Sequence, residues 1–297
     1  MVAAKDSLRF GVLLISDASA RAEWVDKCRR AESLGYDVIV SPDHLNLLSP
    51  FPSAMLAAEV TERPRIGTYV LNACFYNSAL LARDIATTDH FVEGRMELGI
   101  GTGYVESEFT ATKIPFGSPG SRVDRMEALL DDLEAHFAHG DQPRPLQQPW
   151  PPVLIGGHGD RVLRLAARRA QIVSFTGAEF RPQYGRTALA NAAKMLEKVK
   201  LVRAEAAERA PDLEFNVLVK AVVLTQDRRS AAEAEAVRRY GPDLTTEELL
   251  EVPTLLLGTA AQIAEQVRSH SSAYGITYFT VMEPAMEDFG KVIAILR

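Results

Sequence analysis

The sequence predicts a (β/α)₈ TIM barrel that occupies residues 1–297 as one domain. Two observations carry this prediction. About eight short apolar runs alternate with segments of helical periodicity along the chain. These runs are apolar throughout, which is typical of parallel strands that are buried on both faces. An open doubly wound sheet is the alternative, but that fold normally carries a nucleotide fingerprint after its first strand, and Ile15–Ala18 contains none.

Four strands are expected in the first half of the chain, each a buried apolar run too short for a helix. The strands are Leu8–Ile15, Val38–Ser41, Arg65–Asn72 and Met96–Ile100, and the helices between them are Arg21–Leu34, Phe51–Glu62 and Ser78–Val92. Asp17 and Ser19 stand where the first helix would be capped, and Gly35 and Gly94 would end the first and third helices. The segment Glu106–Gly120 contains two prolines and two glycines, so we expect an irregular loop there.

The second half of the chain supplies the other four strands. A helix at Ser121–His139 precedes Asp141–Pro152, whose five prolines predict an extended arm. The remaining strands are Val153–Ile155, Ile172–Phe175, Phe215–Leu224 and Ile276–Met282. Helices are expected at Arg161–Ala170, Gly185–Ala207, Thr259–Tyr274 and Ala285–Leu296, with further helical segments before Leu250.

Composition excludes several classes of protein. The chain is 47% hydrophobic and 24% charged with a formal charge of -6, and it has no long basic run, which argues against nucleic acid as the main partner. Cys28 and Cys74 are the only cysteines, and their spacing fits neither a zinc site nor a disulfide framework. The first nine residues lack a signal peptide, and no stretch approaches the roughly 18 apolar residues of a membrane span. We therefore expect a cytoplasmic protein with no membrane partner.

In a barrel of this kind the active site forms at the carboxyl ends of the strands. This rule selects candidate residues from the sequence before any other consideration. They are Asp43 and His44, Asn72 to Cys74, Gly101 to Tyr104, Gly156 to Asp160, Phe175 to Gly177, and Glu283.

The most distinctive of these segments is the fourth strand with its glycines. Gly99, Gly101 and Gly103 alternate along its end, which removes side chains where a planar or bulky group could press on the main chain. A tight turn with a bulge is the alternative interpretation. Tyr104 occupies the place of the last glycine in Gly-x-Gly-x-x-Gly, so a dinucleotide fingerprint is not supported.

A second glycine-rich segment, Gly156 to Asp160, leads directly into a helix. Exposed backbone N–H groups at a helix start, with the positive end of the dipole behind them, suit a phosphate, and Arg161 could add charge. The alternative is a flexible turn followed by a helix cap at Asp160. No Gly-Lys-Ser/Thr sequence follows, which excludes a nucleoside-triphosphate P-loop.

Asp43 and His44 form the only acid–imidazole pair at a strand end. A histidine there can exchange a proton near neutral pH, and a neighbouring carboxylate can hold its tautomer. The alternative is a capping aspartate beside a histidine that only packs. No group of His, Asp and Glu has metal-ligand spacing, and no Gly-x-Ser-x-Gly nucleophile elbow occurs, so we expect no metal.

These motifs, taken together and in order, resemble those of the bacterial luciferase-like superfamily. The matching stretches are Ser41–His44, Ile66–Asn72, Ala79–Asp89, Gly94–Gly103, Pro152–Gly157, Leu163–Ala167 and Gly258–Ile263. Within the superfamily the chain is most similar to the branch of probable coenzyme F420-dependent oxidoreductases, of which the Asp-His pair is typical. FMN-dependent members share the same frame.

The resemblance implies a role for each matching residue. It implies that Asp43 contacts the cofactor and that His44 donates the proton. It implies further cofactor contacts at Tyr69 and Val70, which a non-proline cis peptide bond joins and which form the back wall of the ring site. It places Asn72 near the pyrimidine side of the ring and Thr102 and Gly103 beneath the ring. It also implies that the phosphate is bound by Gly156, Gly157, Gly159 and Asp160.

One departure from the family bears on the substrate. The sugar-phosphate dehydrogenases of the group have a glutamate directly after Gly-Thr-Gly, where this chain has Tyr104, which argues against a sugar phosphate. Tyr104 and Phe175 are the candidate substrate contacts. The resemblance implies hydride transfer between F420 and a small organic substrate, and commonly a homodimer formed through outer helices. The alternatives are an FMNH₂-dependent monooxygenase that uses O₂ and a barrel that binds the cofactor without turnover.

Overall fold

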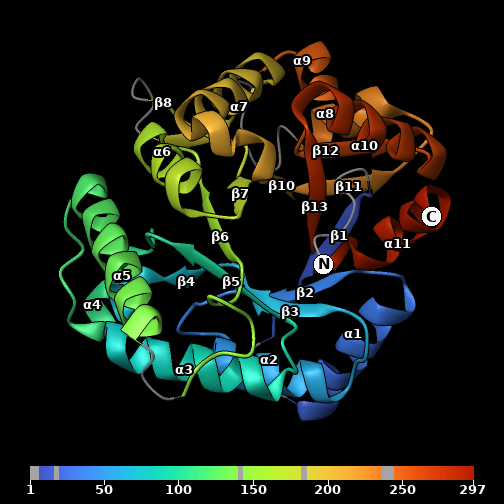
Figure 1. The fold of residues 1–297 in the computed structure, drawn as a ribbon. Coiled ribbons are helices and arrows are strands. Elements are labelled where there is room, and N and C mark those ends of the chain that lie inside the picture. Colours follow the sequence, from blue (N-terminus) through green and yellow to red (C-terminus); the bar gives the residue numbers. More distant parts are fainter. Residues whose placement is uncertain (1–6, 17–19, 140–142, 182–185, 236–243) are drawn as a thin grey trace.

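The computed structural model describes residues 7–16, 20–139, 143–181, 186–235 and 244–297. Eight parallel strands form a closed barrel, and helices surround it (Figure 1). In sequence order the strands are β1 (Arg9–Leu13), β2 (Val38–Ser41), β3 (Arg65–Thr68), β5 (Met96–Gly101), β6 (Val153–Gly157), β7 (Ile172–Phe175), β10 (Glu214–Val219) and β13 (Ile276–Met282). Each pairs in parallel with its neighbours, and β3 pairs with β5 to close the ring. The predicted (β/α)₈ barrel is confirmed.

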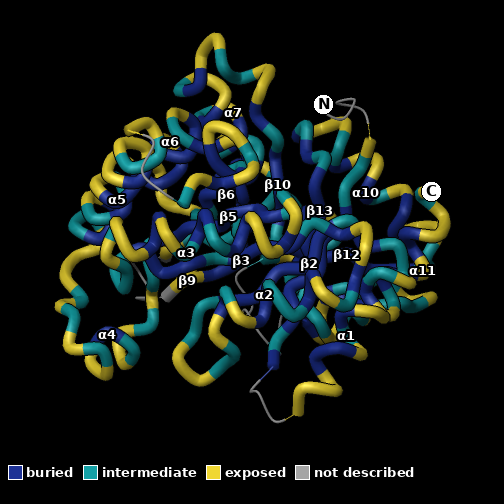
Figure 2. Tube along the Cα trace, turned by 60° about the horizontal axis from the view of Figure 1, so that its bottom comes forward, coloured by how far each residue is buried: buried dark blue, intermediate teal, exposed yellow. Residues whose placement is uncertain are grey.

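Helices connect and cover the strands. They are α1 (Arg21–Ser33), α2 (Pro50–Glu59), α3 (Ser78–Phe91), α4 (Glu106–Thr112), α5 (Pro119–His139), α6 (Asp160–Arg169), α7 (Ala192–Ala206), α8 (Arg228–Glu235), α9 (Thr246–Glu251), α10 (Ala260–Tyr274) and α11 (Met286–Leu296). Figure 2 shows the strands buried and the outer faces of the helices exposed. None of the described helices is long and apolar enough to cross a membrane.

The apolar runs of the strands serve two cores at once. On β1, Phe10 and Val12 belong to the large cluster between the barrel and its helices, whereas Leu13 belongs to a cluster that includes Val40 and Tyr278. Successive side chains of a strand point to opposite faces of the sheet, so a barrel strand covered by helices needs apolar residues on both. This requirement explains why the strands read as continuous rather than alternating apolar runs.

The amino end of the barrel is closed by charged side chains inside the ring. Arg9 donates hydrogen bonds to Glu97 and to Glu214 (2.6 Å), and Arg65 Nε lies 2.8 Å from Glu97 Oε1. The Arg9 guanidinium also lies over the Tyr278 ring, 4.7 Å from its centroid. Burial alone would lower the pKa of Arg9, but the two glutamates outweigh it and raise that pKa overall. Arg9, Arg65, Glu97 and Glu214 are thus held together by ion pairs.

The seam that closes the barrel, between β3 and β5, is unusually tight. A side chain at Gly67 would overlap the carbonyl oxygen of Glu97, and one at Gly99 would overlap that of Thr68. The Thr68 hydroxyl donates to the Gly99 carbonyl oxygen (2.8 Å) and accepts from the Gly99 N–H (3.0 Å). Glycine is therefore required where the two backbones approach most closely.

The structure corrects the expected third strand. It is interrupted at Tyr69–Val70, where the peptide bond is cis as the resemblance implies, and resumes as β4 (Leu71–Asn72). Asp17 and Ser19, the expected caps of the first helix, lie outside the described residues. The residue at the N-cap of α1 is Ala20, which makes no side-chain cap.

Three further segments differ from expectation because tertiary pairing decided their structure. Residues 106–112 form α4 rather than an irregular loop, since Phe109 packs between Phe75 and Phe116 with ring centroids 5.1 and 5.0 Å away. The expected strand Phe215–Leu224 divides into β10 and β11 (Ala221–Leu224), and β11 leaves the barrel to pair with β12 (Leu255–Gly258). The expected helix from Gly185 begins only at Ala192, because residues 186–189 form a hairpin strand, β9, with β8 (Ala178–Arg181).

Candidate functional site

The structure brings most of the predicted residues together at the carboxyl ends of the strands. Asp43 and His44 follow β2, and Asn72 ends β4 beside them. Asp43 Oδ2 accepts hydrogen bonds from the Asn72 N–H (2.9 Å) and the Tyr76 hydroxyl (3.0 Å). Burial raises the pKa of Asp43, although these two donors work in the opposite direction. The carboxyl group is therefore directed into the protein, toward β4.

Asn72 is the most informative side chain of this group. It is 4% exposed, and its Oδ1 accepts a hydrogen bond from the Cys74 N–H (3.2 Å). Its Nδ2 has no partner among the described residues. A buried amide that lacks a partner costs free energy unless a ligand or water supplies one.

Gly103 adjoins Asn72 directly. Its φ of 67° lies in the left-handed region, and a side chain there would overlap the Asn72 amide. Thr102, the preceding residue, receives a weak hydrogen bond at its carbonyl oxygen from Cys74 Sγ (3.8 Å). Asp43, Asn72, Thr102 and Gly103 thus form one contiguous corner of the barrel mouth.

The side chain of Val70 lies against the glycines of β5, where a bulky or planar group was expected. Side chains at Gly99 and at Gly101 would meet the side chain of Val70. The bulky group that presses on this backbone is thus part of the protein itself. Behind it, Tyr69 is 7% exposed and its hydroxyl contacts Ser174 and Asn216 Oδ1 (3.1 Å) inside the barrel.

His44 lies between two side chains from the segment that follows β5. Its Nδ1 is 2.9 Å from Glu108 Oε1, and the same oxygen accepts a hydrogen bond from the Leu45 N–H (3.2 Å). Its Nε2 lies 3.5 Å from the Tyr104 hydroxyl, with the two rings edge to face. The Tyr104 residue is 76% exposed, so this side of His44 faces the mouth of the barrel.

Glu108 escaped the sequence analysis because α4 was not predicted. Its partner His44 lies 64 residues away, so no local pattern links them. A weak local signal was the acidic pair Glu106 and Glu108, since acidic residues are typical of the first turn of a helix.

The glycine-rich segment after β6 forms the amino terminus of α6. The N-cap is Gly159, which makes no side-chain cap, and a Cβ added there would meet open space. Asp160 does not cap the helix either, because its carboxylate pairs with Lys198. Arg161 turns away to Asp124 and the Gly120 carbonyl oxygen (3.0 Å). Among the described residues, no side chain accepts a hydrogen bond from the first backbone N–H groups of this helix.

Lys198 and Lys220 bring positive charge near this helix, and neither was among the residues predicted from the sequence. Burial lowers the pKa of His158, and the nearby charges of Lys220 and Lys198 lower it further. A small hollow lies here, lined in part by Gly157, His158, Phe175 and Lys198. Phe175, a predicted substrate contact, is 2% exposed and packs edge to face on Phe215, so most of its surface is core.

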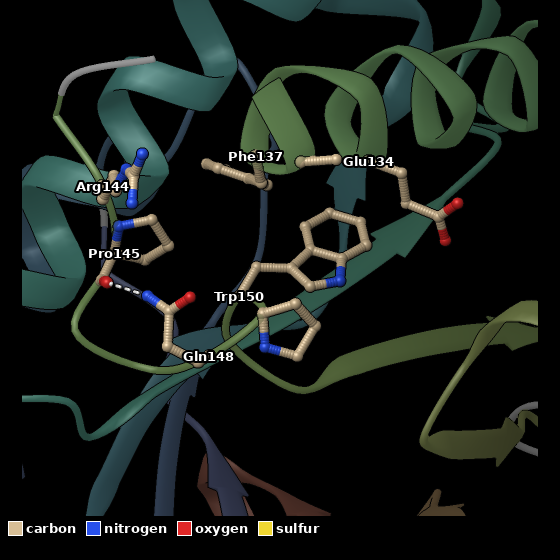
Figure 3. Close-up of a pocket in the computed structure, with 8 residues that line it drawn as sticks. Glu134, Phe137, Arg144, Pro145, Gln148 and Trp150 are labelled. Carbon is tan, nitrogen blue, oxygen red and sulfur yellow. Dashed lines mark hydrogen bonds between the residues drawn. The ribbon is translucent and has the colours of Figure 1, made fainter. Parts of the chain in front are cut away.

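A larger hollow of about 520 Å³ lies at the other end of the barrel. It is formed by the end of α5 and the segment before β6, with Phe137 and Trp150 at its centre (Figure 3). Gln148 Nε2 donates to the Pro145 carbonyl oxygen at its edge (2.8 Å). It contains none of the predicted site residues. Within the described residues, no group of three or more His, Cys, Asp and Glu side chains could hold a metal ion.

Relatives of this chain use two different cofactors. The FMNH₂-dependent dimethylsulfone monooxygenase of Pseudomonas putida is 25% identical over 353 residues, covering 97% of this chain and 92% of that protein. The F420-dependent glucose-6-phosphate dehydrogenase of Kribbella flavida is 32% identical over 134 residues, covering 42% of this chain and 40% of that protein. The match to a relative from Mycobacterium bovis spans 41% of the length of that protein.

A solved structure and a family model give the same answer about the fold. The coenzyme F420-dependent tetrahydromethanopterin reductase from Methanopyrus kandleri has a TM-score of 0.73 at 18% identity, over 98% of this chain and 100% of that chain. The model of the luciferase-like monooxygenase family matches residues 8–253. Because this match covers well over half of its residues, the chain belongs to the luciferase-like monooxygenase family, in which F420-dependent and FMNH₂-dependent oxidoreductases both occur.

Proposed function

We propose that this protein is an oxidoreductase that transfers a hydride between coenzyme F420 and a small organic substrate, with His44 as proton donor or acceptor. The observation that carries the proposal is the buried Asn72 amide, whose Nδ2 lacks a partner beside Asp43 and Gly103. A ring carbonyl on the pyrimidine side of a deazaflavin is an acceptor of the kind this donor requires. Thr176 Oγ1, also buried without a partner at the end of β7, offers a second polar contact.

The amino terminus of α6 supports binding of the anionic tail of the cofactor. Its uncapped N–H groups and helix dipole favour a phosphate. Lys198 and Lys220 lie close enough to lower the pKa of His158, so their positive charges act near this helix start, although Lys198 also pairs with Asp160. The two lysines would supply the charge that Arg161 was expected to provide.

The residues around His44 support proton transfer. The cofactor, when bound, supplies the hydride chemistry, and the protein supplies position and electrostatics. His44 Nε2 faces the open mouth, where an oxygen of the substrate could accept its proton. Tyr104 and Leu45, both largely exposed at the rim, would contact the substrate from the same side.

The choice of F420 over FMN rests on the Asp43–His44 pair and on the higher local identity with the F420-dependent relative, 32% against 25%. The second candidate is an FMNH₂-dependent monooxygenase that uses O₂. It is favoured by the alignment with the dimethylsulfone monooxygenase, which extends over 97% of this chain.

Titration of the purified protein with F420 and with FMN, each followed by fluorescence, separates the two candidates. We expect F420 to bind with a Kd in the micromolar range or below and FMN to bind at least about tenfold more weakly. Micromolar binding of FMN alone, with oxygen consumption when a flavin reductase is added, would establish the monooxygenase instead.

The role of His44 is tested by His44→Ala. Turnover of reduced F420 with an acceptor found by screening ketones, aldehydes and activated alkenes should fall by about 10²–10⁴, with F420 affinity unchanged within about threefold. His90→Ala is the control, because His90 is exposed on α3 and its Nε2 contacts the Arg144 carbonyl oxygen, away from the predicted site residues. Equal turnover of the His44 variant and wild type would remove His44 from the reaction. A wild-type protein that binds F420 and never turns over would indicate a binding barrel.

A further inference from the structure

We infer that Glu108 is the positioning residue of the site, which holds His44 in the tautomer that carries its proton on Nδ1 and turns Nε2 toward the substrate. This inference rests on the proposed role of His44. Glu108 lies outside the stretches that resemble the luciferase-like superfamily, on the helix α4 that the sequence did not predict.

The direction of the hydrogen bond follows from the chemistry of the two partners. An ionised carboxylate can only accept, and Glu108 Oε1 lies 2.9 Å from His44 Nδ1. The Leu45 N–H also points at this oxygen, at 3.2 Å, and a backbone N–H can only donate. Both contacts therefore make Oε1 an acceptor, so the proton lies on Nδ1. Nε2 is left as the nitrogen that exchanges a proton with the substrate.

Glu108 is held rigidly enough to perform this task. The next residue, Phe109, is 1% exposed and packs between Phe75 and Phe116. Glu108 itself has a side chain only 12% exposed, against 28% for His44. Partial burial strengthens a hydrogen bond of this kind, because less water competes for its donor and acceptor.

Asp43, the neighbouring carboxylate expected to hold the tautomer, has other partners. Its Oδ2 is taken by the Asn72 N–H and the Tyr76 hydroxyl. Asp43 and His44 are thus held by different parts of the chain. Asp43 is fixed by β4 and the turn after it, and His44 by α4.

The decisive measurement is the tautomer of His44, read from ¹⁵N shifts of the imidazole above pH 8 in protein without cofactor. We expect the Nδ1–H form to dominate in wild type and in Glu106→Ala, and to fall to a minority in Glu108→Ala. Glu106 is a matched control, because it lies on the same short helix but is exposed. A Glu108→Ala protein with the wild-type tautomer would overturn the inference. Because no cofactor is present, this outcome is independent of whether F420 binds.

Two further measurements sharpen the assignment. Glu108→Gln retains an oxygen that can accept from both Leu45 and His44, so it should keep the Nδ1–H tautomer; loss of that tautomer would contradict the acceptor role of Oε1. In the F420 assay, Glu108→Ala should lower kcat by about tenfold to a hundredfold while F420 affinity stays within about threefold. An equal loss in Glu106→Ala would show that α4 has merely been disturbed.

Discussion

The two ends of the barrel use polar residues in opposite ways. At the amino end, Arg9, Arg65, Glu97 and Glu214 form ion pairs with one another inside the ring. At the carboxyl end, Ser16 Oγ, Asn72 Nδ2 and Thr176 Oγ1 are buried without a hydrogen-bond partner among the described residues. At the amino end, Glu97 Oε2 and the Tyr278 hydroxyl also lack a partner, but Glu97 Oε1 contacts two arginines and the Tyr278 ring lies under one of them. The charged groups of the amino end are therefore engaged mainly with one another, whereas the polar atoms named at the carboxyl end have hydrogen-bonding capacity that the proposed cofactor would use.

The contrast between the two ends would fail if the ion pairs at the amino end did not stabilise the fold. Glu97→Leu leaves the partly buried guanidinium groups of Arg9 and Arg65 without the partner they share, so we expect the free energy of unfolding to fall by about 1–3 kcal/mol. Urea denaturation measures this loss. Glu287→Leu, which breaks the exposed pair with Arg30, should cost far less. Similar losses in the two variants would show that the charges inside the barrel contribute no more than a surface pair.

At the carboxyl end a substitution should affect binding more than folding. Gly103→Ala forces a side chain into the left-handed region and displaces the Asn72 amide. We expect about 1–2 kcal/mol of lost stability and at least a tenfold loss in affinity for F420. Gly117→Ala is the matched control, because φ there is 64° and the new side chain meets only Ser121. It should lose similar stability and no affinity; equal affinities of the two variants would contradict the role of Asn72.

The smallest expected effect is a change in how the stability depends on pH, and its sign is the main prediction. Burial raises the pKa of Asp43, so the folded protein binds this proton more tightly than the unfolded chain does. Stability from this group is present below its ordinary pKa and is lost as the pH rises through the raised value. Asp43→Asn lacks this loss, so its stability relative to wild type should increase between pH 4 and pH 7, by less than about 1 kcal/mol.

Asp160→Asn provides a control of opposite sign for this pH dependence. Lys198 lowers the pKa of Asp160, so the wild-type carboxylate gains stability as the pH rises. The asparagine variant should therefore lose stability relative to wild type as the pH rises to about 4, the ordinary pKa of an aspartate, and change little above it. Urea midpoints at about pH 3, 4 and 7 test both variants, and a loss of stability of the Asp43 variant relative to wild type between pH 4 and pH 7 would refute the burial argument for Asp43.

The barrel could be predicted from sequence because each of its strands is a local signal. Runs such as Val38–Ser41 and Ile172–Phe175 are fully buried and match their predicted bounds. The segments outside the barrel were less predictable. β12 pairs only with β11, and residues 186–189 are a strand only because β8 lies alongside them. Long-range pairing, which no window of sequence contains, decided these segments.

The candidate site likewise contains residues that a local sequence signal revealed and residues that depend on long-range contacts. Asp43, His44, Asn72 and Gly103 were found because they stand at strand ends, and the structure places them together. Glu108 and Lys198 were missed because their positions depend on long-range contacts, of α4 with the segment after β2 and of α7 with the start of α6. Arg161 was assigned to the phosphate by adjacency, but its partner is Asp124 on α5.

The tight seam between β3 and β5 has a consequence for how the ring is completed. Two neighbouring strands of a barrel built from similar β/α units could in principle pair in a shifted register. Here a shift of one residue would set Leu98 or Ile100 against the backbone that Gly99 now admits, and their side chains would collide with it. The glycines thus fix the alignment of β3 and β5 by excluding the neighbouring registers sterically.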